Sequence, residues 1–192
     1  MRHSPGTIPA LADLQALCRD RANWLAVTSA IIAIRQATAA DVERIRIIYN
    51  EGIEDRIATL DLEPKSAAEI AAWWSEHAGR YEVVVAERDG KVVGWAALNP
   101  YSHRCAYDAV ADLSVYVARA ARGTGVGGAL LRDVEHRARE RAFRKIVLFT
   151  LPFNESGQAL YRKHGYREVG TFKEQGTIDG ERVDVMAMEK LL

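Results

Sequence analysis

The stretch from Leu113 to Leu131 constrains the fold of this chain more than any other. A strand, a short basic connector, a glycine-rich turn and the start of a helix follow one another there. Backbone N–H groups at a helix N-terminus are unpaired and lie at the positive end of the helix dipole. Glycines leave no Cβ in the way of a ligand, and Arg122 adds a positive charge. The stretch therefore predicts a binding site for a diphosphate.

Two nucleotide-binding patterns fit these residues. Residues 123–128 match the dinucleotide pattern G-x-G-x-x-G, and residues 122–127 match R-x-x-G-x-G, the pyrophosphate loop of the GNAT N-acetyltransferases. The dinucleotide pattern follows its strand directly and has an acidic residue about 20 positions later. Here residues 118–122 intervene, and the next strand ends at Thr150 without a carboxylate. The second pattern is favoured, and an ordinary glycine-rich turn remains the alternative for either pattern taken alone.

Composition indicates a water-soluble globular protein. The chain has 192 residues, enough for one domain with a real core, and its formal net charge of zero gives no reason to expect nucleic acid as a partner. No run of about 18 apolar residues predicts a membrane span. Cys18 and Cys105, without C-x-x-C spacing, suggest no disulfide framework and no metal site. We expect a cytoplasmic protein, in which Cys105 is a small, partly buried thiol rather than a nucleophile.

The chain divides into an N-terminal extension, residues 1–30, and a domain of residues 31–192. The extension is expected to be an extra helix from Pro9 to Ala26 or a partly ordered arm. In the domain, a helix opens at Thr38, and residues 50–62 break its period, so a loop or a broken helix is expected there. Further helices are expected over 66–77, 125–142 and 154–164, and strands over 31–36, 81–87, 91–98, 110–117, 145–150, 166–172 and 182–189. This order predicts a mixed, mostly antiparallel α/β sheet of six to seven strands, with helices on both faces.

A second motif lies after the strand that ends at Thr150. Residues 154–166 fit N-x-x-[AG]-x-x-L-Y-x-K-x-G-[FY], a segment found in the GNAT superfamily. With the glycine turn before it, the chain resembles that superfamily over about residues 32–192. Residues 47–50, 58–64 and 114–117 are similar to phosphinothricin acetyltransferase, and residues 53–59 and 103–107 to the arsinothricin branch. The resemblance implies transfer of acetyl from acetyl-CoA to the α-amine of a glutamate-like amino acid, by a homodimer.

The resemblance also implies roles for two residues in the chemistry. An amine attacks a thioester only as the free base, so a carboxylate must take its proton, directly or through water. The family places a glutamate just before S-V-Y-V, and here that position is Asp112, one methylene shorter. Tyr161 occupies the position of the general acid that protonates the leaving thiolate. A hydrogen-bonded strand carboxylate and a packing tyrosine are the alternative interpretations.

The remaining site residues follow from the same resemblance. The oxyanion would be held by a backbone N–H near Leu113 to Val115. The expected acetyl-CoA site consists of Val115, Tyr116, Val117, Arg122, Gly123, Thr124, Gly125, Val126, Gly127, Gly128, Asn154 and Tyr161. Arg104 matches an arginine near the acceptor, whereas a second arginine found in several relatives is replaced by Ser102. The expected acceptor site consists of Thr59, Leu60, Arg104 and Tyr107. The alternative interpretation of Arg104 is an exposed loop arginine that binds no ligand.

Three other functions remain open from the sequence. The same catalyst could act on a protein N-terminus, a polyamine or a plain amino acid. The replacement of glutamate by Asp112 leaves open a module that binds acetyl-CoA without turnover. A nicotinamide-dependent enzyme is the third and is the least favoured.

Overall fold

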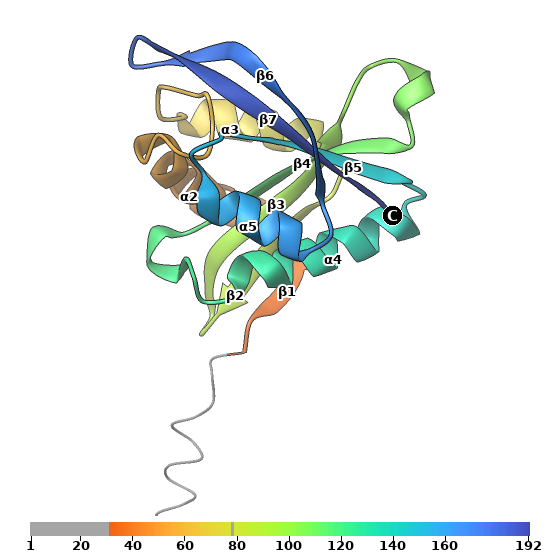
Figure 1. The fold of residues 1–192 in the computed structure, drawn as a ribbon. Coiled ribbons are helices and arrows are strands. Elements are labelled where there is room, and N and C mark those ends of the chain that lie inside the picture. Colours follow the sequence, from red (N-terminus) through yellow and green to blue (C-terminus); the bar gives the residue numbers. More distant parts are fainter. Residues whose placement is uncertain (1–30, 78) are drawn as a thin grey trace, which may run out of the picture. The chain divides into compact units, whose positions relative to one another are not determined.

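A seven-stranded sheet runs through the computed structural model, which describes residues 31–77 and 79–192 (Figure 1). Its strand order is β1-β2-β3-β4-β5-β7-β6. All neighbours pair antiparallel except β4 and β5, which are parallel. The predicted extension, residues 1–30 with its expected helix from Pro9 to Ala26, lies outside the described residues. The strands are β1 (Ala33–Gln36), β2 (Val83–Arg88), β3 (Lys91–Pro100), β4 (Val110–Val117), β5 (Lys145–Thr150), β6 (Arg167–Ile178) and β7 (Glu181–Leu191).

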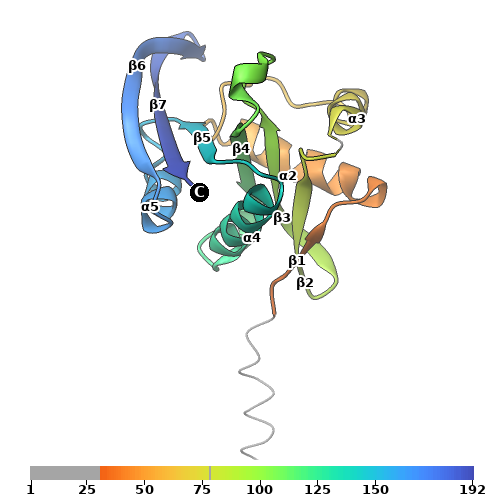
Figure 2. The same cartoon turned by 90° about the vertical axis from the view of Figure 1, so that its right-hand side faces the viewer.

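Helices cover both faces of the sheet, as predicted. The helices α2 (Val42–Glu54) and α3 (Ala67–Glu76) lie on one side of the strands β1–β4, and α4 (Val126–Glu140) lies on the other (Figure 2). The fourth helix, α5 (Glu155–Lys163), follows β5. Its Leu160 lies against Gly127 at the start of α4. The predicted mixed α/β fold is therefore confirmed. No helix in the described part of the chain is long and apolar enough to cross a membrane.

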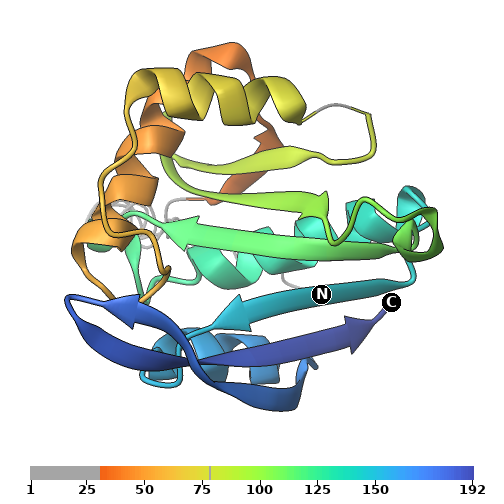
Figure 3. The ribbon, with the colours of Figure 1, turned by 90° about the horizontal axis from the view of Figure 1, so that it is seen from above.

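The two parallel strands pair over only a short length and then diverge (Figure 3). Residues 110–112 of β4 pair with residues 145–147 of β5. Beyond that point β4 stays paired with β3, and β5 stays paired with β7. The facing edges of β4 and β5 are then left without a strand partner. This opening carries backbone groups that are free to bind a ligand.

A close contact on the sheet sets the position of α4. A Cβ at Gly94 of β3 would lie 2.9 Å from Val126 Cγ1, 3.1 Å from Leu130 Cδ1 and 3.1 Å from the Tyr116 carbonyl oxygen. Only glycine lets the first turn of α4 approach the sheet this closely. The N-terminus of α4 is thereby held beside the end of β4, where the glycine-rich turn connects the two elements.

The loop or broken helix predicted over residues 50–62 begins later than expected, because α2 continues as a regular helix to Glu54. The Asn50 side chain is buried and makes two hydrogen bonds with Lys65, accepting from its backbone N–H at 2.8 Å and donating to its carbonyl oxygen at 3.0 Å. Gly52 faces the Tyr116 ring, where a Cβ would lie 3.0 Å from Cδ1. Asn50 and Gly52 interrupt the apolar period because one contacts the loop at Lys65 and the other the ring of Tyr116. The helix continues through both residues.

Other local predictions were confirmed. Ser66 caps α3 in a capping box with Glu69, and Asp89 and Gly90 have the positive φ angles of a two-residue hairpin turn. The last two strands are longer than predicted. The β6–β7 register shifts between Phe172 and Gly176, and pairing then continues to Ile178. Because this part of β6 is mostly exposed and polar, hydrophobic alternation does not reveal it.

Candidate active site

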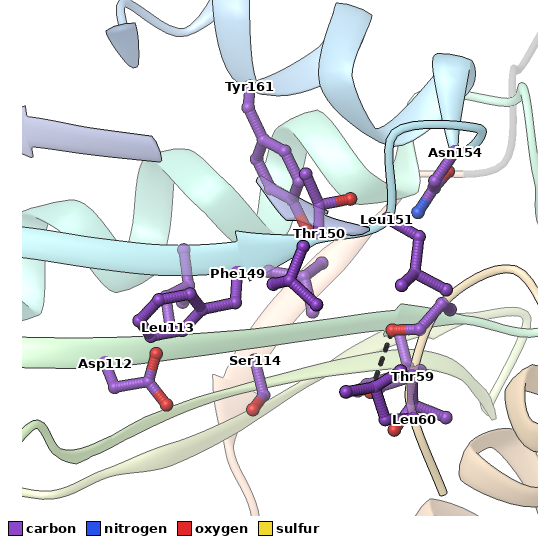
Figure 4. A pocket seen from close by; sticks show the side chains of 14 residues that line it. Thr59, Leu60, Asp112, Leu113, Ser114, Phe149, Thr150, Leu151, Asn154 and Tyr161 are labelled. Atoms are coloured by element: carbon purple, nitrogen blue, oxygen red, sulfur yellow. Dashed lines mark hydrogen bonds between the residues drawn. The ribbon is translucent and has the colours of Figure 1, made fainter. Parts of the chain in front are cut away.

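A cavity of about 240 Å³ lies at the opening between β4 and β5 (Figure 4). We call it the acceptor cavity. Its walls come from the loop after α2, from β4 and β5, from the segment after β5, from β7 and from α5. Asp112 is the only charged residue among those that line it. The lining residues are Ala58, Thr59, Leu60, Asp112, Leu113, Ser114, Val115, Tyr116, Phe149, Thr150, Leu151, Asn154, Tyr161 and Val185.

A larger cavity of about 430 Å³, the glycine groove, adjoins it. The two cavities share the lining residues Ala58, Val115, Tyr116, Asn154 and Tyr161. The glycine groove runs along the α4 N-terminus and α5. Ten of the predicted cofactor residues line it, namely Val115, Tyr116, Val117, Arg122, Gly123, Gly125, Gly127, Gly128, Asn154 and Tyr161.

Side chains of β4 alternate between the two faces of the sheet. Tyr116 packs against Tyr49 of α2, with ring centroids 4.7 Å apart, so Asp112 and Ser114 point to the α2 face as well. Val117 points to the other face, where a Cβ at Gly127 of α4 would lie 3.8 Å from Val117 Cγ2. The opening between β4 and β5 thus connects a groove on the α4 face with a carboxylate on the α2 face.

Burial tunes the carboxyl group of Asp112. Loss of solvent raises its pKa to about 6, and a hydrogen bond from the Leu113 backbone N–H opposes this shift. No side chain among the described residues donates a hydrogen bond to the Asp112 carboxyl group. A carboxyl group with this pKa is mostly ionised at neutral pH yet basic enough to take a proton.

The Tyr161 hydroxyl reaches the same opening from α5 (Figure 4). Burial, followed by the charge of Asp112, raises its pKa to about 12. Tyr161 therefore keeps its proton at neutral pH and can donate it. A carboxyl group from β4 and a phenol hydroxyl from α5 thus line one cavity.

The start of α4 has the features of an anion site. The N-cap residue Gly125 has a φ of +89°, a left-handed conformation that favours glycine, and a Cβ there would meet no atom within 4 Å. The following N–H groups belong to the first turn of the helix and have no intrahelical acceptor. The glycine groove therefore has the features of a diphosphate-binding site.

Arg122 lines the groove, but its guanidinium is already paired. It donates to the Asp55 carboxylate, which follows α2, and to the Val117 carbonyl oxygen at 3.2 Å. Arg119 donates to the same carboxylate at 2.7 Å. Hydrogen bonds from Arg119 and then Arg122 lower the pKa of Asp55. Asp55 was missed in the sequence, and it fixes the position of Arg122 beside the glycine turn.

The Asn154 side chain caps α5 and also borders the site. Its Oδ1 accepts a hydrogen bond from the Gly157 backbone N–H at 3.0 Å, which caps α5. Its Nδ2 makes no hydrogen bond with the described residues, and the side chain borders both cavities. The cap thus leaves the Nδ2 group free to donate to a ligand.

Four predicted residues line neither cavity. Val126 is only 1% exposed and packs in the core, and the Thr124 hydroxyl donates to the Ala121 carbonyl oxygen. Arg104 and Tyr107 lie on the exposed loop between β3 and β4. Thr59 and Leu60, by contrast, line the acceptor cavity as expected.

The structure adds cavity residues to which the sequence gave no role. Ser114 and Thr150 place hydroxyl groups there, and Phe149, Leu151 and Val185 provide apolar walls. Thr150 is the one polar residue at the end of an apolar strand, which is a signal that could have identified it. Over residues 31–77 and 79–192, no three His, Cys, Asp or Glu side chains gather where they could hold a metal ion.

Comparison with known proteins gives the family. Residues 45–166 match the acetyltransferase (GNAT) family. The phosphinothricin N-acetyltransferase of Streptomyces coelicolor is 30% identical over 169 residues, which cover 85% of this chain and 98% of that protein.

Solved structures agree with this assignment. A phosphinothricin acetyltransferase from Sinorhizobium meliloti, in complex with acetyl-CoA, superposes with a TM-score of 0.80 at 33% identity, covering 84% of this chain and 88% of the other. A ribosomal-protein-alanine N-acetyltransferase from Brucella melitensis gives 0.80 at 34% identity, covering 83% and 99%. The chain therefore belongs to the GNAT acetyltransferase family and is an acetyl-CoA-dependent N-acetyltransferase.

Proposed function

We propose that this enzyme acetylates the α-amine of a glutamate-like amino acid, such as phosphinothricin, arsinothricin or methionine sulfoximine, and so detoxifies it. The observation that carries the proposal is the acceptor cavity, where Asp112 faces one side of the opening and Tyr161 the other. Its volume of about 240 Å³ lies below the usual range for drug-sized ligands and suits a small acceptor. The relative in Streptomyces coelicolor, named for phosphinothricin, supports this substrate class.

Asp112 is the general base in this proposal. Its carboxylate accepts a proton from the acceptor amine, directly or through a water, and leaves the nitrogen lone pair free to attack. Its position on the α2 face separates the acceptor from the glycine groove, so the amine approaches the opening from the side opposite the cofactor.

Tyr161 and the free edge of β4 complete the chemistry. Acetyl-CoA supplies the acetyl group as a thioester. Backbone N–H groups near Leu113 to Val115 hold the oxyanion of the tetrahedral intermediate, because β4 has no partner on its β5 side there. Tyr161 donates its proton to the departing sulfur. Val115, Val117 and Asn154 hold the pantetheine arm.

The backbone amides that follow Arg122 hold the diphosphate in this proposal, and Arg122 adds charge beside them. Replacing Arg122 with alanine is therefore expected to raise the KM for acetyl-CoA about tenfold, the effect of one charge-assisted hydrogen bond. The KM for the acceptor should stay unchanged. Arg119→Ala is the matched control, because Arg119 shares Asp55 but does not line the groove. Equal effects of the two substitutions in steady-state kinetics would assign Arg122 a structural role only.

Arg104 is proposed to hold an anionic group of the acceptor. None of the residues that line the acceptor cavity is cationic, and Arg104 lies on the loop that leads into β4. Arg104→Ala should raise the acceptor KM about tenfold and leave the acetyl-CoA KM unchanged. Arg80→Ala, which removes an arginine from outside both cavities, serves as the control. Equal changes in both KM values would exclude this role.

We also propose that the enzyme is a cytoplasmic homodimer. Phe149 and Phe172 are 45% and 50% exposed, with ring centroids 6.4 Å apart, and Phe149 borders the acceptor cavity. Exposed apolar groups of this kind favour association. Cys105 is exposed and not partly buried as predicted, and a free thiol there is compatible with a reducing compartment. Analytical ultracentrifugation would measure the oligomeric state directly.

A protein N-terminus is the second candidate acceptor. It is favoured by one comparison, the structure from Brucella melitensis that is named for ribosomal-protein alanine. A peptide that begins with alanine would present the same kind of α-amine to Asp112. The small volume of the acceptor cavity favours the free amino acid instead.

A thiol-release assay tests the proposed function. The panel contains phosphinothricin, arsinothricin, methionine sulfoximine, glutamate, spermidine and an alanine-starting peptide, each with acetyl-CoA. The proposal expects the highest kcat/KM for one of the first three, with a product acetylated on the α-nitrogen by mass spectrometry. A preference for the peptide or for spermidine would contradict it.

A further inference from the structure

A chain of hydrogen bonds connects α3 with the acceptor cavity. The His77 Nδ1 lies 2.8 Å from the Trp73 carbonyl oxygen, and His77 Nε2 lies 2.9 Å from Asn99 Oδ1. Asn99 Nδ2 then donates to Ser114 Oγ at 3.1 Å and to the Asp112 carbonyl oxygen at 3.3 Å. None of the functional assignments above uses the side chains of His77, Asn99 or Ser114.

The direction of these bonds follows from the chemistry of the side chains. Asn99 pairs directly with Asp112 across β3 and β4, so its amide lies beside the backbone of the proposed base. The reversed amide would place its oxygen against the Asp112 carbonyl oxygen, which has no proton to share. The amide nitrogen therefore faces Ser114, and the amide oxygen faces His77 Nε2.

This arrangement determines what the Ser114 hydroxyl can still do. A hydroxyl has one proton to donate and two lone pairs that accept. Asn99 uses one lone pair, and no described residue accepts the proton. Ser114 lines the acceptor cavity on the same face as Asp112, two residues further along β4. The hydroxyl proton is thus available to a molecule in that cavity.

We propose that Ser114, oriented by Asn99 and His77, donates its hydroxyl proton to the α-carboxylate of the acceptor while Asp112 engages the amine. An α-amino acid has its amine and carboxylate on one carbon, so it can reach two side chains that follow each other on one face of a strand. Among the described residues that line this cavity none is cationic, and Ser114 is the hydroxyl donor nearest to Asp112 along β4 on the same face. This inference rests on the proposed function and assigns the side chain that recognises the α-carboxylate of the acceptor.

Kinetics of Ser114→Ala test this inference. The variant should raise the KM for the amino acid about tenfold, the loss of one hydrogen bond to a charged group, and leave the acetyl-CoA KM unchanged. With the decarboxylated form of the same amino acid as acceptor, parent and variant should have equal KM values. An equal rise with both acceptors would overturn the inference.

Further variants separate orientation from folding. Ser114→Thr keeps the hydroxyl and should restore the parent KM. Asn99→Asp replaces the donor with a carboxylate that accepts the Ser114 proton, so its KM for the amino acid should match that of Ser114→Ala. The double variant with both substitutions should show no further rise in this KM. Ser75→Ala, on the exposed face of α3, is the control. If a His77→Ala variant keeps the parent KM for the amino acid, His77 does not help to orient Ser114.

The outcomes distinguish this inference from the proposed function. If the enzyme acetylates plain α-amino acids and no glutamate analogue, the proposed function fails while the role of Ser114 can still hold. If it acetylates only amines that lack a carboxylate, both fail. If glutamate analogues are substrates but Ser114→Ala leaves their KM unchanged, only the inference fails.

Discussion

Replacing Asp112 with asparagine should lower kcat by about 10²-fold or more, the usual loss when a general base is removed. Acetyl-CoA affinity should stay nearly unchanged, because Asp112 does not line the glycine groove. The amide has the same shape as the carboxyl group but cannot accept the proton of the amine. Thiol release measures the loss of turnover, and calorimetry measures acetyl-CoA binding. A general base is indicated if turnover falls while acetyl-CoA binding is unchanged.

The pH dependence provides a second measure of Asp112. Because its pKa is about 6, the carboxyl group is protonated and inactive as a base below that value. In the parent enzyme kcat/KM should therefore fall about tenfold per pH unit below pH 6. Asp108→Asn, which changes an exposed carboxylate outside both cavities, should leave the profile unchanged. A flat profile between pH 5 and pH 7 would remove Asp112 from the mechanism.

The free energy of unfolding should depend on pH in the opposite direction to kcat/KM. The pKa of Asp112 is raised on folding, so its favourable contribution is present at low pH and is lost as pH rises through about 6. At neutral pH the ionised, partly buried group costs on the order of 2 kcal/mol of unfolding free energy. Asp112→Asn should therefore raise the urea midpoint at pH 7.5, with the gain disappearing below about pH 4. Asp112→Glu keeps the carboxylate and should keep turnover.

Replacing Tyr161 with phenylalanine should also lower kcat, by about 10²-fold, because the departing thiolate loses its proton donor. The pKa of about 12 keeps the hydroxyl protonated, so the parent should show no alkaline loss due to Tyr161 below about pH 11. With Asp112→Asn in the same chain, the loss should be smaller than the product of the two single losses, since both groups serve one reaction.

Tyr166→Phe is the matched control for Tyr161. The two rings are 5.8 Å apart, but Tyr166 lines neither cavity. The control should keep full turnover. If Tyr161→Phe also kept it, the proton for the thiolate would have to come from another donor, and Tyr161 would be a packing residue.

The sequence predicts those parts of the fold that depend on local chemistry. The Ser66 cap, the Asp89-Gly90 turn and the glycine turn before α4 each follow from a few adjacent residues, and the structure contains all three. The end of α2 could not be predicted, because Asn50 is stabilised by Lys65, 15 positions away. The far part of β6 is exposed, so it gives no hydrophobic signal.

The same limit applies to the site. Asp112 and Tyr161 were found through motifs, and the structure brings both to one cavity. Arg122 pairs with Asp55, which lies 67 positions away in the sequence, so no local pattern predicts this contact. The alignment of Asn99 with Asp112 depends on the register of β3 and β4, which only the folded sheet fixes.

A crystal structure of the enzyme with bound acetyl-CoA tests the central claim most directly. We predict the diphosphate on the backbone amides that follow Arg122, and the thioester at the opening between β4 and β5 with Asp112 on its far side. A structure with that turn empty and the ligand bound elsewhere would contradict the account.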